Sequence, residues 1–342
     1  MISIFILLLL LNLFIFFNFE KLSKITDIYD IPDKRLKLHK KKTPIMGGII
    51  LAVNFSILFT YQTFFLGDFL SIKSNQLNFI EIFSSLFFIF GYFFLGLFDD
   101  KFDLTPNWKL FYSIIIVSLV IFFNDSLIIK MLSLSFYEKK IFFENYSYFF
   151  TIFCIIILIN ALNFYDGING QSFVIFITSF CFLLIKSEMN YFYLMTILLI
   201  LFILQFNIRN KIFLGDSGIY LLGIILSLCL IYEHNIQKNI IFSDEIFFLL
   251  ILPGIDLLRL TVNRLLKQKN PFFGDRNHIH HLLIKRYSIL FSNLILFFVS
   301  VIPLILFSYF KLNFFLVSFI FLIIYVFLIQ FLNTNDKKYN HK

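Results

Sequence analysis

Three of the chain's six histidines stand within four positions of the stretch FGDRNHIHHLL, beside an aspartate and an arginine. Zinc sites built on histidine use spaced patterns such as HExxH, and this stretch has none. A solvated polar loop needs no histidine cluster. The remaining interpretation is recognition of phosphate or sugar oxygens by side chains that donate hydrogen bonds. Four side chains of the stretch can do so: Arg276, His278, His280 and His281.

Two adjacent acids, Asp99 and Asp100, end an apolar run in the stretch GLFDD. Two carboxylates at the C-terminal end of a helix oppose the helix dipole, which favours a functional interpretation over ordinary solvated loop acids. Hard cations take oxygen ligands, so the pair is a candidate for Mg²⁺ binding or proton transfer. With Asp103 the pair also forms a DDxxD pattern, as in membrane prenyltransferases, but no second acidic cluster accompanies it.

The stretch NALNFYDGING closes another apolar run. Asn160, Asn163 and Asp166 recur every three residues, so they share one face if the helix continues. Gly167 and Gly170 then permit tight turns and the close approach of a ligand. Asparagine near the end of a membrane helix can instead bond only to neighbouring helices. The stripe followed by glycines favours a binding site.

Two further clusters suit phosphate. In FLGDSG, Asp216 or Ser217 could cap the helix that follows, and the free N–H groups of such a helix start also suit a phosphate. Asp216 could hold a metal that bridges phosphate oxygens. In HKKKTPIMGG, the lysines 40–42 either fix the topology and attract anionic lipid or contact phosphate directly.

The rest of the sequence is strongly apolar. Of 342 residues, 59% are hydrophobic, and the mean hydropathy is +0.87. A soluble protein of this size could not hide so much apolar surface, because it still needs a polar shell. The runs are long enough to cross a hydrocarbon layer of about 30 Å. We therefore predict an all-α, polytopic membrane protein that forms a single domain over residues 1–342.

About eleven apolar runs are predicted to span the membrane. The first lacks a basic start and a cleavage site, so we expect it to be retained as a helix rather than removed as a signal peptide. The runs cover residues 1–19, 45–66, 77–98, 108–124, 149–164, 172–187, 190–207, 217–233, 245–263, 287–309 and 312–333. Residues 125–148 are predicted to form an extracytoplasmic loop.

The basic residues indicate the orientation. With these spans, 22 of the 29 Lys and Arg residues fall on one side of the membrane, which the positive-inside rule assigns to the cytoplasm. The N-terminus is then outside and the C-terminus cytoplasmic. All five polar clusters fall on the cytoplasmic side. They therefore predict one composite site at that surface.

Taken in the order in which they occur along the chain, GLFDD, NALNFYDGING, FLGDSG and DRNHIHH resemble the motifs of the polyprenyl-phosphate N-acetylhexosamine-1-phosphate transferases of glycosyltransferase family 4. The resemblance extends roughly from His39 to His281. The resemblance implies transfer of a sugar-1-phosphate from a UDP-N-acetylhexosamine to undecaprenyl or another polyprenyl phosphate, with release of UMP. It implies Mg²⁺, or Mn²⁺, as cofactor and a multi-pass location in the bacterial inner membrane. The expected partners are both substrates, the lipid bilayer and a second copy of the chain, with no nucleic acid.

The resemblance also assigns roles to the polar residues of the first clusters. Asp216 and Asn163 match the metal ligands at the diphosphate. Asp99, with Asp100 beside it, matches the acid that deprotonates or positions the lipid phosphate. Asp166 matches a further polar position of the site and is expected to be catalytic.

Other residues are expected to bind substrate. Lys109 matches a lysine that contacts phosphate, and Asn169 and Phe213 match residues that contact uracil. The histidine loop, with Arg276, would contact sugar and phosphate. Its form DRNHIHHLL resembles the branch that starts O-antigen, enterobacterial common antigen or teichoic acid linkage units, which favours UDP-GlcNAc as donor.

Pro253 and Gly254 interrupt a predicted span, and a Pro-Gly pair kinks a membrane helix. The resemblance implies that this broken helix borders a groove for the prenyl chain.

Three alternatives to this function stay open. They are the phospho-MurNAc-pentapeptide transferase of peptidoglycan synthesis, a DDxxD prenyltransferase, and an ion-coupled transporter, whose acids would lie nearer mid-membrane.

Overall fold

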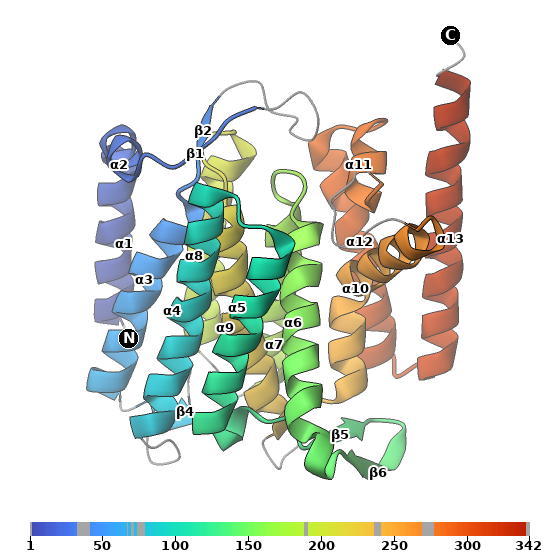
Figure 1. Cartoon of the computed structure of the whole chain (residues 1–342), viewed down its shortest axis with the longest axis horizontal. Helices are drawn as coiled ribbons and strands as arrows, with labels where there is room; N and C mark the ends of the chain where they lie inside the picture. The colour runs from blue at the N-terminus through green and yellow to red at the C-terminus, as the bar shows by residue number, and fades with distance from the viewer. Residues whose placement is uncertain are drawn as a thin grey trace.

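The computed structural model describes residues 2–32, 42–66, 68–69, 72–73, 79–187, 191–235, 241–268 and 277–339. The helices stand side by side as a bundle (Figure 1). The prediction of an all-α, polytopic membrane protein is confirmed by these long apolar helices. Two sequence predictions lie outside the described residues, namely Arg276 and residues 39–41 of the lysine cluster.

The helices are α1 (Ile2–Phe17), α2 (Phe19–Thr26), α3 (Gly47–Tyr61), α4 (Phe79–Phe102), α5 (Pro106–Phe123), α6 (Ser147–Tyr165), α7 (Gln171–Lys186), α8 (Tyr191–Ile208), α9 (Gly215–Asn235), α10 (Ser243–Leu266), α11 (Ile279–Ile284), α12 (Ile289–Ser308) and α13 (Phe314–Tyr339). Three antiparallel pairs of short strands join them. The pairs are β1 (Tyr29–Asp30) with β2 (Thr43–Pro44), β3 (Asp68–Phe69) with β4 (Ile72–Lys73), and β5 (Met131–Leu134) with β6 (Tyr137–Phe142).

Each predicted apolar run contains a helix, but the count of eleven spans is not confirmed. Within the described residues, eight helices are long and apolar enough to cross a membrane: α3, α4, α5, α6, α8, α9, α12 and α13. Helices α1 and α2, which meet at an 80° bend, make a ninth span if the two are counted together as one. Helix α7 has only 16 residues, and α10 carries five charged side chains.

Residues 125–148 were predicted as a loop, and the structure corrects this to a folded segment that contains the hairpin β5–β6. The carboxylate of Asp244, at the start of α10, accepts hydrogen bonds of 2.7 Å from the backbone N–H and the hydroxyl of Ser135. Because Ser135 lies in the turn between the strands, this contact ties the hairpin to α10. The partner lies 109 residues away, so the local sequence could not show it.

Helix α9 is the centre of the bundle. Of its apolar window, 89% is buried inside the protein, and it packs against α3, α4 and α6. Lipid tails are as apolar as the helices, so helices in a membrane associate through close packing rather than a hydrophobic driving force. Two glycines allow this close packing. A Cβ atom on Gly96 of α4 would lie 2.6 Å from the Asp216 backbone, and one on Gly48 of α3 would lie 2.5 Å from Gly218 N.

The polar clusters gather at one end of the bundle. Helices α4, α6 and α8 end there, and α3, α5 and α9 begin there, as the upper end of Figure 1 shows. The prediction that distant clusters share one end is confirmed for the described residues.

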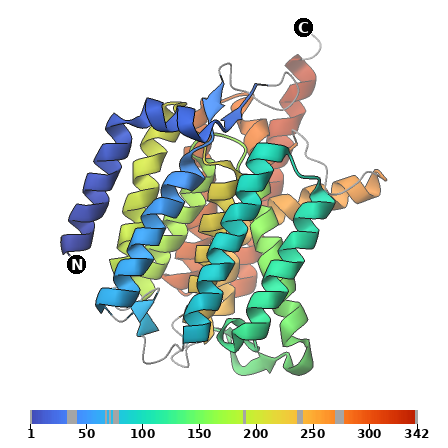
Figure 2. The same ribbon diagram turned by 60° about the vertical axis from the view of Figure 1, so that its left-hand side comes forward.

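Helix α10 bends where the sequence predicts it. Pro253 lies inside the helix, and the part that follows runs across towards α13 (Figure 1) and out from the body (Figure 2). Proline lacks the N–H that would continue the hydrogen-bond ladder, which explains the bend. Beside it lies a largely apolar groove of about 730 Å³, lined by α6, α9, α10, α13 and the hairpin. Pro253 and Gly254 are part of its lining.

The packing of α4 on α9 predicts a difference between two glycines of the same helix. Gly96→Ala should lower the free energy of unfolding by about 1–3 kcal/mol, because the new Cβ overpacks against the α9 backbone. Gly91→Ala is the matched control, since its Cβ would meet only Ile116 at 3.4 Å. Thermal unfolding of both variants in detergent measures this. Equal midpoints would contradict the close packing.

Candidate active site

The carboxylate of Asp100 caps α9. Its two oxygens accept hydrogen bonds from the backbone N–H groups of Asp216, at 2.8 Å, and Ser217, at 3.0 Å. Neither Asp216 nor Ser217 therefore acts as the cap considered from the sequence. The dipole argument also changes: Asp100 ends α4 unfavourably, but it meets the positive end of α9, where an anion is stabilised. Two N–H groups considered for phosphate are already bonded to Asp100.

The segment before α9 is held by backbone pairing with the start of α3. The N–H groups of Gly47 and Gly48 donate to the carbonyl oxygens of Phe213 and Leu214, both at 3.0 Å. The N–H of Phe213 donates to Pro44 O, also at 3.0 Å. The described part of HKKKTPIMGG is therefore a structural support for FLGDSG. Its fixed backbone places Asp216 at the end of the bundle.

Lys109 connects the two acids on α4 and α9. Its ammonium forms an ion pair with Asp99 and a second one of 3.3 Å with Asp216. Asp99 is buried, and its other oxygen accepts from the backbone N–H of Leu104 at 2.9 Å. The side chains of Lys109 and Asp216 keep 28% and 30% exposure, so both can be reached from outside. Lys109 thus offsets the charge of two neighbouring carboxylates and leaves one negative charge in the group, which suits a divalent cation.

The end of α6 adds Asn163 and Asp166. The Asn163 side chain interacts with Asp216. Helix α6 ends at Tyr165, so Asp166 is the residue that follows the helix rather than a continuation of the predicted stripe. Burial raises the pKa of the Asp166 carboxyl to about 7; the Ser172 hydroxyl opposes this shift, and the nearby Asp216 adds to it. The neutral form of Asp166 is therefore favoured more than that of an ordinary aspartate.

Asp216 and Asn163 are the candidate metal ligands of the site. In the described part of the chain, no three His, Cys, Asp or Glu side chains are grouped to hold one. Magnesium, however, is usually held by one or two carboxylates with substrate phosphates and water rather than by an all-protein cage. Asp216 supplies a carboxylate, and the neighbouring Asn163 donates its amide NH₂ to it, which leaves the amide oxygen for another partner. These residues therefore fit a magnesium ion that also binds a diphosphate.

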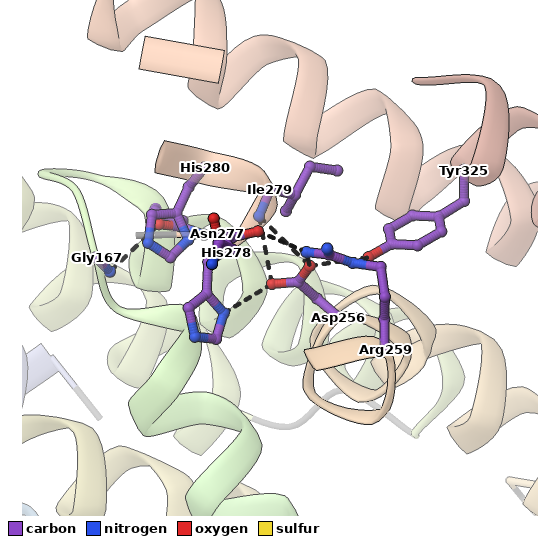
Figure 3. Close-up of polar contacts among 9 residues, drawn as sticks. Gly167, Asp256, Arg259, Asn277, His278, Ile279, His280 and Tyr325 are labelled. Atoms are coloured by element: carbon purple, nitrogen blue, oxygen red, sulfur yellow. Dashed lines mark hydrogen bonds and ion pairs between the residues drawn. The ribbon is translucent and has the colours of Figure 1, made fainter. Parts of the chain in front are cut away.

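The histidine loop packs against the end of α6 (Figure 3). The ring of His278 lies 5.8 Å from that of Phe164, with an interplanar angle of 15°. His278 Nδ1 is 2.9 Å from a carboxylate oxygen of Asp256 on α10. Because a carboxylate only accepts, Nδ1 carries the proton. The predicted loop residue His278 thus packs against the end of α6, the helix that also carries Asn163.

His280 is fully enclosed. Gly167 N–H donates to Gln171 Oε1 at 3.3 Å, so the Gln171 amide nitrogen faces His280 Nδ1 at 3.0 Å, and Nδ1 must accept. Burial, with the neighbouring His281 and His278 rings, lowers the pKa of His280 well below its usual range. A Cβ on Gly167 would lie 1.8 Å from His280 Nε2, so glycine is required there. His280 therefore joins the two loops, while His281 is only partly buried.

The residues predicted to contact uracil lie at the loop after α8. Asn169 Nδ2 donates to Asn210 Oδ1 at 2.6 Å, and Phe213 ends that loop through its backbone pairing. Two further asparagines fix the same turn. Asn207 accepts from Gly170 N–H at 2.8 Å, and Asn293 donates to Asn169 O at 2.7 Å.

The structure thus gathers the predicted residues in three groups around one end of the bundle. Asp99, Lys109 and Asp216 form the first, with Asn163 and Asp166 beside them. The histidines form the second, and Asn169 and Phe213 the third.

Several supporting residues escaped the sequence reasoning. Asn207, Gln171 and Asn293 carry no local signal, because their partners are distant in the chain. Asp256 did carry one: an ionisable residue within an apolar run is a functional candidate by default. The stretch ILPGIDLLR contains it, and only its Pro-Gly pair was used.

The family model described as "Glycosyl transferase family 4" matches residues 82–234. Several curated proteins similar to this chain are named undecaprenyl-phosphate alpha-N-acetylglucosaminyl 1-phosphate transferase. The protein from Escherichia coli O157:H7 is 27% identical over 277 residues, which cover 78% of this chain and 71% of the relative. The protein from Salmonella typhi is 27% identical over 75% of this chain and 69% of the relative. The protein from Thermotoga maritima is 26% identical over 81% of this chain and 80% of the relative.

The matched region contains Asp99, Lys109, Asn163 and Asp216, and the alignments to the relatives extend over most of the chain. The resemblance predicted from the motifs is thereby confirmed: this chain is similar to proteins named undecaprenyl-phosphate alpha-N-acetylglucosaminyl 1-phosphate transferase, and residues 82–234 match the model of glycosyl transferase family 4.

Proposed function

We propose that this protein transfers GlcNAc-1-phosphate from UDP-GlcNAc to undecaprenyl phosphate, releases UMP and so starts a lipid-linked cell-surface glycan. The observation that carries the proposal is the placement of Lys109 between Asp99 and Asp216 at an accessible end of the bundle. The names of the relatives supply the acceptor and the sugar.

The reaction needs alignment and charge neutralisation more than covalent catalysis. An oxygen of the lipid phosphate attacks the β-phosphorus, the bond from that phosphorus to the bridging oxygen breaks, and UMP leaves with that oxygen. Lys109 offsets negative charge on the phosphates from its position between the two acids. Asp99 orients the acceptor phosphate or takes its proton. Two backbone N–H groups of α9 hold Asp100, whereas one oxygen of Asp99 is held by Lys109, the side chain that we assign to the phosphates, so we assign Asp99 to the acceptor.

We further propose Mg²⁺ as the cofactor, held by Asp216 and Asn163. When bound, the ion supplies positive charge at the diphosphate and helps to align it. The oxygen donors and their proximity support this assignment. We assign the histidine loop to the sugar, and the two loops that contain Asn169 and Phe213 to the uridine.

The apolar groove beside α10 is assigned to the prenyl chain. It is lined by apolar side chains from four helices and extends along the bent part of α10. Lipid tails are as apolar as the groove, so the groove would select the chain by shape rather than by hydrophobicity. We place the site on the cytoplasmic face of the inner membrane, because 22 of the 29 basic residues fall on that side of the predicted topology.

The alternatives lack such support. A DDxxD prenyltransferase would need Asp103 with the pair, but Asp103 is exposed and Asp100 caps α9. A transporter would carry its acids near mid-membrane, whereas these acids stand at helix ends.

The direct test is a transfer assay with purified protein, undecaprenyl phosphate and a panel of UDP-sugars. We expect UMP release and labelled lipid with UDP-GlcNAc, and loss of both when EDTA removes the divalent cation. Asp216→Asn should lower turnover by about 10²-fold or more, because it removes a charge that acts on the reacting groups. UMP release that persists unchanged in EDTA would contradict the metal assignment.

The two adjacent acids should behave differently. Asp99→Asn should lower turnover by about 10²-fold or more if it handles the acceptor phosphate. Asp100→Asn should lower it less than about tenfold, because asparagine is a comparable cap and keeps one of the two hydrogen bonds. Asp100→Ala should also lower the unfolding temperature. Equal losses in the two Asn variants, at unchanged unfolding temperatures, would refute this division.

The groove assignment predicts an effect confined to the acceptor. Leu158→Trp narrows the groove and should raise the KM for undecaprenyl phosphate several-fold while leaving the KM for UDP-GlcNAc unchanged. Leu194→Trp, on the exposed face of α8 outside the groove, is the control. With an acceptor that has a shorter prenyl chain, the difference in acceptor KM between Leu158→Trp and the wild type should be smaller. If both substitutions change the same KM equally, the groove does not hold the acceptor.

A further inference from the structure

Asp256 is a buried acid on which four groups converge (Figure 3). Its Oδ1 accepts from a terminal guanidinium nitrogen of Arg259 at 2.7 Å and from the Tyr325 hydroxyl at 2.8 Å. Its Oδ2 accepts from His278 Nδ1 at 2.9 Å, and the backbone N–H of Ile279 lies 3.4 Å from both oxygens. One carboxylate therefore joins α10, the start of α11 and α13.

These contacts fix the ring of His278. With Nδ1 donating to Asp256, Nε2 is the nitrogen on the ring edge turned away from Asp256 (Figure 3). Among the described residues Nε2 has no hydrogen-bond partner. The ring is also nearly parallel to Phe164, at 15°, and to His280, at 13°. Its tautomer and its orientation are thus both set by neighbours.

We propose that Asp256 is a positioning residue for the transfer reaction, which acts through His278 and directs its Nε2 towards the diphosphate of the bound donor. The inference rests on the proposed function. Asp256 itself is only 1% exposed and both its oxygens are bonded, so it does not reach the substrate. His278 stacks on Phe164 at the end of α6, the same helix end that carries the proposed metal ligand Asn163.

The bend in α10 is what makes this contact available. Asp256 follows Pro253 by three residues, in the part of the helix that turns across towards α13 (Figure 1). Tyr325 of α13 also accepts from Arg259 Nε at 2.9 Å, and Arg259 donates to Asn277 O at 2.7 Å. The Asp256 carboxylate, the Arg259 guanidinium and the Tyr325 phenol thus bond to one another, and Arg259 also fixes the backbone just before His278.

Asparagine at position 256 would reverse the tautomer of His278. The Oδ1 position faces the donors of Arg259 and Tyr325, so the amide oxygen would take that place. The amide NH₂ would then face His278 Nδ1, and because it only donates, Nδ1 would have to accept. Asp256→Asn therefore changes the proton position on His278 while keeping the size of the side chain.

A double-mutant cycle tests the role, with UMP release from UDP-GlcNAc and undecaprenyl phosphate measured in the full chain. Asp256→Asn should lower kcat about 10- to 100-fold, the range found for groups that orient a functional histidine. In a His278→Ala background the same substitution should change kcat less than about twofold, because the two residues act as one unit. Tyr325→Phe keeps the carboxylate and the His278 contact, so its loss should be much smaller.

A second variant tests the role without touching Asp256. The amide nitrogen of His278→Asn can replace Nδ1 as donor to Asp256, but nothing replaces Nε2. We expect an unfolding temperature near that of the wild type together with a loss of UMP release comparable to that of His278→Ala. This variant keeps the proposal testable if Asp256→Asn does not fold. Retained activity in His278→Asn would overturn the role of Nε2.

The outcomes separate the two proposals. If the wild-type chain releases no UMP from any UDP-N-acetylhexosamine, the proposed function fails and the positioning role fails with it. If the wild type is active but Asp256→Asn lowers kcat equally with and without His278, Asp256 has only a structural role. A non-additive cycle with active wild type supports both.

Discussion

The hydrogen bonds from the start of α9 to the Asp100 carboxylate are the interaction on which the candidate site depends. They join the end of α4, which carries Asp99, to the start of α9, which carries Asp216. A carboxylate at the C-terminal end of its own helix is unfavourable, but the N-terminus of α9 compensates for it. The contact forms only because Gly96 and Gly48 let three helices approach to backbone distance. Small residues in the apolar runs therefore determine where the charged residues lie.

The end of α6 joins the two halves of the site. Asn163 faces Asp216, whereas Phe164, the next residue, stacks on His278. Just beyond the helix, Gly167 contacts His280. Four to five residues of chain thus connect the group around Lys109 with the histidine loop. The end of α6 therefore fixes the position of the Lys109 group and of the histidine loop relative to each other.

The sequence could predict the helices because an apolar run long enough to cross a membrane leaves few other folds. It could also predict that the clusters share one end, since successive spans alternate in direction. It could not predict the partner of Asp100, because nothing in GLFDD identifies the start of α9, 116 residues away. The hairpin held by Asp244 depends on a similarly distant contact. Asp256 is different, because its charge within an apolar run was visible and its significance was missed.

The partners of the acids also explain which one is available for a metal. An acid in a poorly hydrated site needs compensation, and each acid obtains it differently. Asp100 has the start of α9, and Asp99 has Lys109 together with a backbone N–H. Asp166 has its pKa raised by burial to about 7, which favours its neutral form. Asp216 shares Lys109 at the longer distance of 3.3 Å and stays 30% exposed. Lys109 and Asn163 hold Asp216 as a carboxylate while its side chain stays accessible, and an accessible carboxylate is what a magnesium–diphosphate complex would require.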